Sequence, residues 1–335
     1  MGEFSGDHDE GMRNASFYYS KLLAKNNKIL TLDIRYTFNP KFWKEIKEFN
    51  PSIIHYIHGP TIKSLFLLKM MKHYCSKSKI IVSAMRPSFT ILSEKMIPFF
   101  SPDMILTQSI SSEYMFKKRN VKTKFLPSGV DINRFVPCSS ENKIKFKKQY
   151  EIDSNKFVIL HIGSIKDGRN IRVLKSLQNN GNQVIIVGAI SPGIDFNLVH
   201  ELKLAGCMVW EKYFEKVEEL YFLADCYVFP TVDRKNSLGQ SIADSIEMPL
   251  TVLESMSCNL PVIATKFGAL PRAFEEKEGL FFVNGDENEF VEKIEIIKNN
   301  MFTLKTREQV LKYSWENIVD TINKMYLELT LNKLT

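Results

Sequence analysis

The residues best suited to chemistry lie in one stretch, EMPLTVLESMSCNLPVIATKFGALP, which begins at Glu247. It carries two carboxylates, Glu247 and Glu254, and an apolar segment that opens on Pro249. Proline is tolerated in the first turn of a helix because the N–H that it lacks would have no partner there. The unpaired N–H groups and the dipole of a helix N-terminus attract anions. We therefore predict a helix whose first free amides, those of Leu250 and Thr251, bind an anionic group.

A second group of polar residues follows the apolar run KFVILHIG (156–163) directly, in the sequence GSIKDGRN. Ligands of open parallel α/β sheets bind at the carboxyl ends of the strands, so this position favours a binding role over a solvated loop with ordinary surface charges. A positive charge 4 Å from a phosphate oxygen contributes ~4 kcal/mol at an effective dielectric constant of 20. The candidates in this loop are Gly163, Ser164, Lys166 and Arg169.

Apolar, β-branched runs alternate with amphipathic segments along the chain, which indicates parallel sheets covered by helices on both faces. In the first half we predict strands at 28–34, 52–57, 79–84, 104–109 and 122–127, and helices near 14–25, 40–48, 61–75 and 109–119. In the second half we predict strands at 156–163, 182–188, 207–213, 226–231, 261–265 and 279–283, and helices near 169–180, 194–204, 215–223, 249–258, 270–276 and 286–299.

Length and composition indicate a globular protein of two domains. The chain has 335 residues, of which 44% are hydrophobic and 25% charged,. No apolar run reaches the roughly 18 residues of a membrane-spanning helix. The five cysteines are scattered without a C-x-x-C pair, and the first residues are acidic and polar rather than a secretory signal. Both features predict a reduced, cytoplasmic protein without structural zinc.

The formal net charge of +7 is unevenly distributed, because residues 1–140 carry 21 basic and 11 acidic side chains. A basic first half and a mildly acidic second half predict two domains with different partners. A nucleic acid, an anionic membrane surface and a phosphorylated acceptor are all compatible with the basic half.

The predicted elements divide into a first domain (1–137), a linker (138–155), a second domain (156–305) and a final helix (306–335) that crosses back to the first domain. The first domain lacks the apolar strand that normally opens a doubly wound sheet. Either the natural chain begins several residues earlier, or this strand has been lost, or GEFS serves as a short strand.

The chain resembles the retaining, nucleotide-sugar-dependent glycosyltransferases of the GT-B architecture, of the group 1 or family-four type. The resemblance covers nearly the whole chain and is most specific between Pro249 and Pro271. The other matching segments are, in order, PSIIHYIHGP, ILTQSISSEYMFKKRNVKTKFLPSGVDINRFVP, VILHIGSIKDGRNI, ADCYVFPT and YSWENIV. The implied fold is α/β, with two Rossmann-like doubly wound parallel-sheet domains facing across a cleft.

The resemblance implies roles for the candidate residues. The amides of Leu250 and Thr251 would bind the diphosphate of the donor, and Glu254 would accept hydrogen bonds from the ribose hydroxyls. The family has seven residues between its two glutamates, whereas this chain has six. Either the loop is one residue shorter, which we favour, or Glu247 does not contact the donor sugar as its family counterpart does. The alternative to any functional role for Glu247 is that it is an exposed loop carboxylate.

The loop GSIKDGRN also departs from the family pattern. Ser164 stands where the family has an arginine, and Arg169 stands at the position of the family lysine, so Lys166 would supply the missing charge. We assign catalysis to Glu247 and Arg169. The alternative for Glu254 is a first-turn glutamate that only favours the helix dipole.

On the acceptor side, Gly11 resembles the glycine of the loop between the first strand and helix, and Asn14 would cap that helix. After the predicted strand at 79–84, where members of the family often have a histidine, this chain has Arg86 and Ser88 instead. An arginine suits a phosphate-bearing acceptor, although a surface arginine before a proline turn is equally compatible. The Asp7, His8, Asp9 sequence mimics a metal-binding motif, but this architecture requires no metal.

The leading hypothesis is a glycosyltransferase of the hexosyltransferase type. It would move a sugar from a UDP- or GDP-sugar to a hydroxyl acceptor with retention of anomeric configuration, in cell-envelope, glycolipid or glycan assembly. The acceptor would be lipid-linked, and no nucleic acid would bind. The amphipathic, basic segment 61–79 is favoured to pack on the sheet, but a spare apolar side of it and the apolar segment 89–100 would make peripheral contact with the cytosolic membrane face,. The alternatives are a nucleotide-binding partner subunit without useful turnover and, less favoured, a nucleotide-sugar epimerase.

Overall fold

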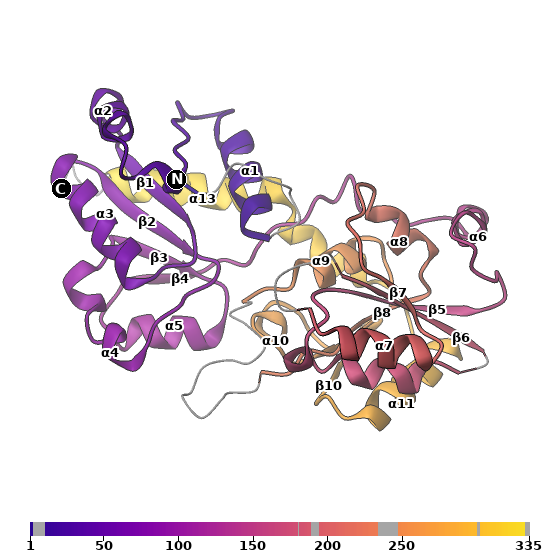
Figure 1. Ribbon diagram of the computed structural model, residues 1–335. Coiled ribbons are helices and arrows are strands. Elements are labelled where there is room, and N and C mark those ends of the chain that lie inside the picture. Colours follow the sequence, from indigo (N-terminus) through magenta and orange to yellow (C-terminus); the bar gives the residue numbers. More distant parts are fainter. Residues whose placement is uncertain (3–10, 180, 189–193, 234–246, 300–301, 332–335) are drawn as a thin grey trace. The chain divides into compact units, whose positions relative to one another are not determined.

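The computed structural model describes residues 1–2, 11–179, 181–188, 194–233, 247–299 and 302–331 (Figure 1). The chain divides into two compact units. Unit 1 comprises Met1–Gly129, Ser245–Met248 and Trp315–Thr335, and unit 2 comprises Val130–Asp244 and Pro249–Ser314. The division at residue 130 lies ahead of the segment 138–155 that we expected as a linker, and this segment contains a helix of unit 2.

Unit 1 contains a four-stranded parallel sheet in which the strands are neighbours in chain order. The strands are β1 (Ile53–His58), β2 (Lys79–Ala84), β3 (Met104–Thr107) and β4 (Thr123–Phe125). The helices are α1 (Gly11–Leu23), α2 (Pro40–Phe49), α3 (Ile62–Tyr74), α4 (Ile91–Glu94), α5 (Ile110–Lys117) and α13 (Trp315–Leu331), with 3₁₀ turns η1 (Ile34–Tyr36) and η2 (Ile97–Phe100).

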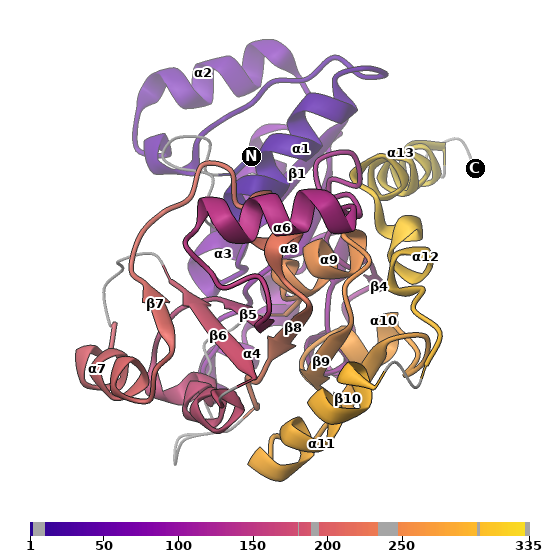
Figure 2. The ribbon, with the colours of Figure 1, turned by 90° about the vertical axis from the view of Figure 1, so that its right-hand side faces the viewer.

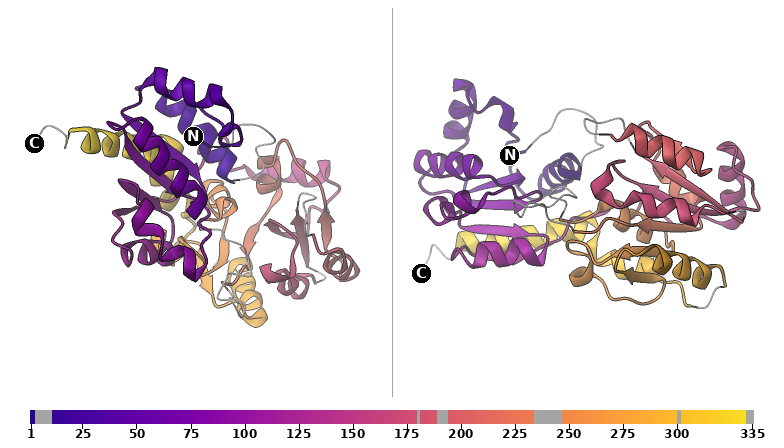
Figure 3. Two further views of the ribbon diagram at one scale, coloured as in Figure 1. Left: turned by 60° about the vertical axis from the view of Figure 1, so that its left-hand side comes forward. Right: turned by 60° about the horizontal axis from the view of Figure 1, so that its bottom comes forward.

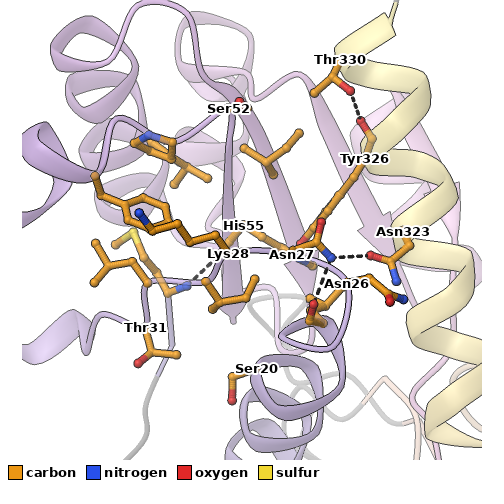
Figure 4. Close-up of a pocket in the computed structure, with 18 of the residues that line it drawn as sticks. Ser20, Asn26, Asn27, Lys28, Thr31, Ser52, His55, Asn323, Tyr326 and Thr330 are labelled. Atoms are coloured by element: carbon orange, nitrogen blue, oxygen red, sulfur yellow. Dashed lines mark hydrogen bonds between the residues drawn. The ribbon is translucent and has the colours of Figure 1, made fainter.

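Strands β1, β2 and β3 of unit 1 are buried on both faces, as parallel strands usually are, whereas the edge strand β4 is partly exposed,. Ile54 and Tyr56 of β1 belong to a core that α2, α3 and α5 complete. The intervening residue, His55, faces the opposite side, where its ring stacks on Tyr19 of α1 and, beside a cavity of about 720 Å³, contacts Tyr326 of α13 (Figure 4). Figure 3 follows α13, in yellow, to this unit.

The strand predicted at 28–34 is not formed. This segment contains one isolated parallel bridge, between Asp33 and Gly2, and then enters η1. An extended segment becomes a strand only through a neighbour that pairs with it, and the described neighbour on this side is limited to Met1 and Gly2. The helix predicted from residue 14 begins at Gly11 instead, so the prediction that Asn14 caps it is wrong.

Unit 2 contains a six-stranded parallel sheet in the order β10-β9-β8-β5-β6-β7 (Figure 2). The strands are β5 (Phe157–Ile162), β6 (Asn182–Val187), β7 (Met208–Trp210), β8 (Cys226–Phe229), β9 (Val262–Thr265) and β10 (Leu280–Val283). Successive strands are added on one side of β5 and then, from β8 onward, on the other. The order therefore reverses between β5 and β8, the type of position at which doubly wound sheets bind ligands.

The helices of unit 2 are α6 (Ser140–Gln149), α7 (Phe196–Leu204), α8 (Glu218–Leu223), α9 (Leu250–Ser257), α10 (Leu270–Ala273), α11 (Glu287–Lys298) and α12 (Thr306–Val310), with 3₁₀ segments η3 (Asp167–Arg169), η4 (Ile171–Leu177) and η5 (Leu311–Tyr313). The helix predicted near 169–180 is η4, which follows the left-handed residue Asn170. The single helix predicted from 306 is three elements, because Ser314 has an extended backbone and pairs with Val130.

Two further features concern the helices and the cysteines. None of the described helices is long and apolar enough to cross a membrane. All five cysteines are free thiols, and four of them are buried. Because buried cysteines behave as small hydrophobic residues, these four contribute packing to the cores.

Candidate functional site

The loop after β5 holds the first group of predicted site residues. Gly163 continues the ladder with a bond from its N–H to the Val187 carbonyl, 2.9 Å away. A Cβ at Gly163 would lie 3.2 Å from the His161 ring, so glycine lets the chain turn closely past this side chain. Lys166 then precedes the short η3 turn, which ends at Arg169. The loop thus brings both cations to the carboxyl end of a central strand.

The N-terminus of α9 is open among the described residues. Pro249 is the N-cap and not the first helical residue, and no side chain caps the helix. The Val252 amide bonds the Pro249 carbonyl at 3.2 Å, whereas no described group accepts from the amides of Leu250 and Thr251. These are the two amides that the sequence analysis assigned to an anion. Unpaired donors at a helix N-terminus favour a phosphate or carboxylate.

Tyr227 of β8 joins this helix end to the end of β5. Its hydroxyl lies 2.6 Å from Thr251 Oγ1 and 3.3 Å from the Ile162 carbonyl oxygen. The phenol has a single proton, so it donates to one of these groups at a time. The contacts place the free amides of α9 beside the loop after β5, where the strand order reverses. Unit 2 therefore combines two sources of positive potential at one point.

Arg169 is buried, with 7% of its surface exposed, although the neighbouring loop residues are more accessible. Its guanidinium charge and the burial of His161 both act on that imidazole. Burial and, to a smaller extent, the Arg169 charge lower the pKa of His161 to about 4, so the ring is neutral at pH 7. The His161 Nδ1 contacts the Val228 carbonyl at 2.9 Å, and Nε2 has no described partner.

A buried guanidinium contributes more to phosphate binding than an exposed one, because water screens it less. Arg172 provides the contrast three residues later. It is exposed and pairs with Asp167 and Glu201. Of the two arginines, only Arg169 carries its charge inside the protein beside the end of β5.

Glu254 lies in the second turn of α9 and is partly buried. The Tyr221 hydroxyl donates to its Oε2 at 2.6 Å. Loss of hydration raises the pKa of this carboxyl, while the Tyr221 hydrogen bond and the Arg134 charge lower it in part. A carboxylate offers about four acceptor positions, so the bond to Tyr221 leaves room for two hydroxyl donors. The arrangement is compatible with the predicted ribose contact.

Asn170 positions the loop. Its backbone is left-handed, with φ +58°, a conformation that asparagine tolerates better than most residues,. Its side-chain amide donates to the carbonyls of Pro230 and Gly285, each at 3.1 Å. These bonds tie the end of η3 to the segments after β8 and β10. A single side chain thereby connects three loops at the same edge of the sheet.

Glu247 belongs to unit 1, whereas Pro249 and the rest of α9 belong to unit 2. It is buried, and its Oε2 accepts a hydrogen bond from Ser112 Oγ at 2.8 Å. The alternative of an exposed loop carboxylate is therefore wrong. Its neighbour Ser112 lies in the first turn of α5. Because Glu247 and the donor residues belong to different units, its catalytic assignment stays a prediction.

The acceptor-side residues lie at the carboxyl ends of β1 and β2. The Ser88 amide donates to the Pro60 carbonyl at 3.0 Å, and a Cβ at Gly59 would meet the Arg86 carbonyl oxygen at 2.1 Å. The two loops thus pack backbone to backbone, which requires glycine at 59, and both Arg86 and Ser88 are exposed. Gly11 is the first residue of α1, and its preceding loop, like the Asp7, His8, Asp9 motif, lies outside the described residues.

The structure brings together Gly163, Ser164, Lys166, Arg169, Pro249, Leu250, Thr251 and Glu254 within unit 2. Sequence reasoning missed Tyr227, Tyr221 and Asn170, which position them. The two tyrosines lie in apolar runs, where a core role is the usual one. Asn170 alone carried a signal, since asparagine tolerates the left-handed backbone conformation better than most residues. Among the described residues, no group of three His, Cys, Asp or Glu side chains could hold a metal ion.

The family model described as glycosyl transferases group 1 matches residues 156–300. The matched segment begins at β5 and ends just after α11, so it contains the loop after β5, Tyr227 and α9.

Curated relatives match over longer segments at low identity. D-inositol 3-phosphate glycosyltransferase of Corynebacterium jeikeium is 24% identical over 229 residues, which are 62% of this chain and 52% of that protein. Sulfoquinovosyl transferase SQD2 of Arabidopsis thaliana is 26% identical over 212 residues, which are 59% of this chain and 38% of that protein. The chain spans about half the length of the first relative and less of the second.

Solved structures cover both units. HepE of Anabaena in complex with UDP superposes with a TM-score of 0.70 at 16% identity, over 85% of this chain and 80% of that one. Sucrose-phosphate synthase of Thermosynechococcus elongatus gives 0.68 at 17% identity, over 91% and 82%. At these identities the likeness shows the fold. It confirms the predicted class, GT-B with two Rossmann-like parallel sheets.

Proposed function

We propose that this protein is a retaining glycosyltransferase that moves a hexosyl group from a UDP- or GDP-sugar to a hydroxyl acceptor. The observation that carries the proposal is the arrangement at the strand-order reversal of unit 2. There the Tyr227 hydroxyl links the uncapped N-terminus of α9 to the end of β5. The group 1 domain match supports the reaction type, and the UDP and UDP-glucose complexes of HepE support this donor class.

The residues of unit 2 have separate roles in the proposal. The amides of Leu250 and Thr251 hold the diphosphate, and Arg169 and Lys166 add positive charge to it. Glu254 accepts hydrogen bonds from the ribose hydroxyls. Stabilising the negative charge that develops on the departing diphosphate is the main catalytic contribution, and removing one such donor typically costs ~10²–10³ in rate.

Retention follows from front-face departure and attack, in which the leaving phosphate itself helps to take the acceptor proton. No dedicated protein base and no metal is then required. Glu247 contacts the donor sugar in this scheme, and Arg86 and Ser88 contact the acceptor.

The acceptor is proposed to be lipid-linked, in cell-envelope or glycolipid assembly at the cytosolic membrane face. The first half of the chain is basic, and unit 1 exposes large apolar side chains on α3, α4 and η2. These include Phe66, Met70, Ile91, Leu92 and Phe99. Exposed apolar residues among lysines favour contact with anionic lipid.

A panel of nucleotide sugars tests the proposal. Release of free UDP or GDP that rises with a hydroxyl acceptor supports the transferase. Binding without release would favour the partner subunit, the second candidate, which the serine at position 164 motivates. A changed sugar that stays attached to its nucleotide would identify an epimerase. The anomeric configuration of the product, read by NMR coupling constants, decides between retention and inversion.

A further inference from the structure

Arg307 belongs to α12, which packs against α9 within unit 2 (Figure 2). The residue is half-buried, and its guanidinium donates to the carbonyl oxygens of Ile132 at 3.0 Å, of Phe135 at 2.9 Å and of Ser257. Ile132 and Phe135 lie in the segment after Val130, whereas Ser257 is the last residue of α9. Because a guanidinium is planar and holds its donors in a fixed fork, Arg307 fixes these two segments relative to each other.

The bond to Ser257 anchors the C-terminal end of α9. The last carbonyls of a helix have no donor within the helix, and a cation beside them also interacts favourably with the helix dipole. The Arg307 amide adds a bond to Asn259 Oδ1 at 3.2 Å, just beyond the helix. α9 has eight residues and is therefore roughly 12 Å long,. Arg307 thus holds α9 at the end opposite the amides of Leu250 and Thr251.

The bond to Phe135 anchors a ring that supports Tyr221. The Phe135 carbonyl also accepts from Ser257 Oγ at 2.6 Å, so two donors hold this peptide group. The Phe135 ring is buried and meets the Tyr221 ring edge to face, with centroids 5.6 Å apart and planes at 86°. Tyr221 is fully buried, and its hydroxyl donates to Glu254 Oε2 at 2.6 Å. The position of that hydroxyl therefore depends on where Phe135 is held.

Glu254 depends on this support for its own position. Among the described residues, Tyr221 is the only hydrogen-bond partner of its carboxylate. The side chain has several rotatable bonds, so without that partner it would populate several rotamers. A carboxylate that moves by about 1 Å leaves the range of roughly 2.5–3.0 Å in which a hydroxyl bonds it well.

We propose that Arg307 is a positioning residue of the nucleotide site, which holds Glu254 within reach of a ribose through Phe135 and Tyr221. The inference rests on the proposed function, because it assigns Arg307 to the ribose contact of Glu254. It adds that a residue outside the site controls how well the protein distinguishes ribose from 2′-deoxyribose. If Arg307 served the fold alone, its loss would weaken both kinds of nucleotide equally.

The test measures how strongly each variant prefers UDP and GDP to their 2′-deoxy forms, by titration calorimetry. Removing a ribose hydroxyl removes a hydrogen bond to a carboxylate, which should weaken binding to the unmodified chain about tenfold. Arg307→Lys keeps the charge but loses the fork, and Phe135→Leu keeps an apolar side chain and the backbone carbonyl. We expect each variant to reduce the preference to about threefold or less.

Asn182→Ala is the matched control for a loss of stability. The Asn182 side chain donates to the Leu177 carbonyl at 2.8 Å, at the start of β6 and away from the carboxyl ends of the strands. This variant should have a lower melting temperature but an unchanged preference. A second control adds Arg307→Lys to Glu254→Gln. It should change the preference no further than Glu254→Gln alone, because both substitutions act through the same carboxylate.

A second readout needs no nucleotide. The Tyr221 hydrogen bond lowers the pKa of the Glu254 carboxyl, so its loss should raise this pKa in Arg307→Lys and Phe135→Leu, neither of which changes the net charge,. Carbon-13 NMR titration of the ligand-free chains measures the pKa, and Asn182→Ala should leave it unmoved.

Each outcome decides the proposal. An unchanged preference in both Arg307→Lys and Phe135→Leu would overturn it, and so would an equal loss of preference in Asn182→Ala. If the unmodified chain bound neither UDP nor GDP, or bound the 2′-deoxy forms equally well, the proposed donor contacts would fail instead. The NMR titration would then still decide whether Arg307 positions Glu254.

Discussion

The two units of this protein use the same alternation of strands and helices but complete their sheets differently. In unit 2, β5 has a parallel neighbour on each side, β6 and β8, and its carboxyl end is the candidate binding edge. In unit 1, β1 has β2 on one side and, among the described residues, bonds with Met1 alone on the other. The comparison teaches that a strand becomes central only when both of its edges are paired. A local apolar pattern cannot supply that second partner.

The two units also differ in the surroundings of a buried histidine, His55 in unit 1 and His161 in unit 2. Both rings face helices or loops that cover a sheet, and burial lowers the pKa of each well below its usual value. His55 of unit 1 has partners on both nitrogens, whereas His161 of unit 2 has one at Nδ1. Among the described residues, the ring with fewer partners is the one beside Arg169, at the candidate site. The His55 ring packs between α1 and α13 of unit 1, whereas the His161 ring lies next to the candidate binding edge of unit 2.

The largest expected effect breaks the site of unit 2. Arg169→Ala and Glu254→Ala should each lower kcat/KM for the nucleotide sugar by about 10²–10³, because each removes a charged contact to the donor. Arg172→Ala is the matched control, since that arginine is exposed and paired. It should retain nearly full activity. Thermal unfolding of all three variants shows whether folding is intact, and near-wild-type activity in both site variants would refute the assignment.

The next largest effect is on the free energy of unfolding, which should depend on pH through His55 in unit 1 and His161 in unit 2. The folded pKa values of about 4 for His161 and lower still for His55 lie below the unfolded value near 6.5,. Their contribution is therefore complete above pH 6.5 and is lost as the pH falls, by about 1.4 kcal/mol per pH unit for each ring. Urea unfolding at pH 7.5 and pH 5 measures this loss, and His55→Ala and His161→Ala should each reduce it.

The same two variants rank the units at pH 7.5. His55→Ala leaves the Tyr326 and Ser83 hydroxyls without their partner, whereas His161→Ala frees one carbonyl. We expect the first variant to lose about 1 kcal/mol more than the second. If His161→Ala lost as much free energy of unfolding as His55→Ala, or more, the additional hydrogen bond of His55 would add no stability. The two rings would then not differ in the way proposed.

The smallest effect sharpens the role of Glu254. Tyr221→Phe removes the hydrogen bond that lowers the pKa of this carboxyl, so the pKa should rise further above its usual value,. If the ionised carboxylate binds the ribose, nucleotide affinity falls on acidification, and this fall should move to higher pH in the variant. Titration calorimetry with UDP and GDP across a pH series measures the shift. An unmoved profile would separate Glu254 from nucleotide binding.

Sequence reasoning predicted most of the helices and strands, and its errors have physical causes. The run 28–34 has the composition of a strand, but strand formation depends on a pairing partner that periodicity cannot show. The helix near 169–180 became a 3₁₀ segment because Asn170 and Gln178 have non-helical backbones at its ends. Tyr227 and Tyr221 were missed because the sequence of an apolar run does not show whether a tyrosine hydroxyl in it forms a hydrogen bond at the site.

The amino-acid order by itself determined the alternation of elements, the helix that begins after Pro249 and the charged loop after β5, because these follow from local composition and spacing. Only the tertiary structure decided which cation is buried, which hydroxyl links two loops and to which unit Glu247 belongs. Burial and hydrogen bonding between distant segments depend on packing, which no local pattern contains. For the same reason, the open edge of β1 could be recognised only after the sheet was assembled.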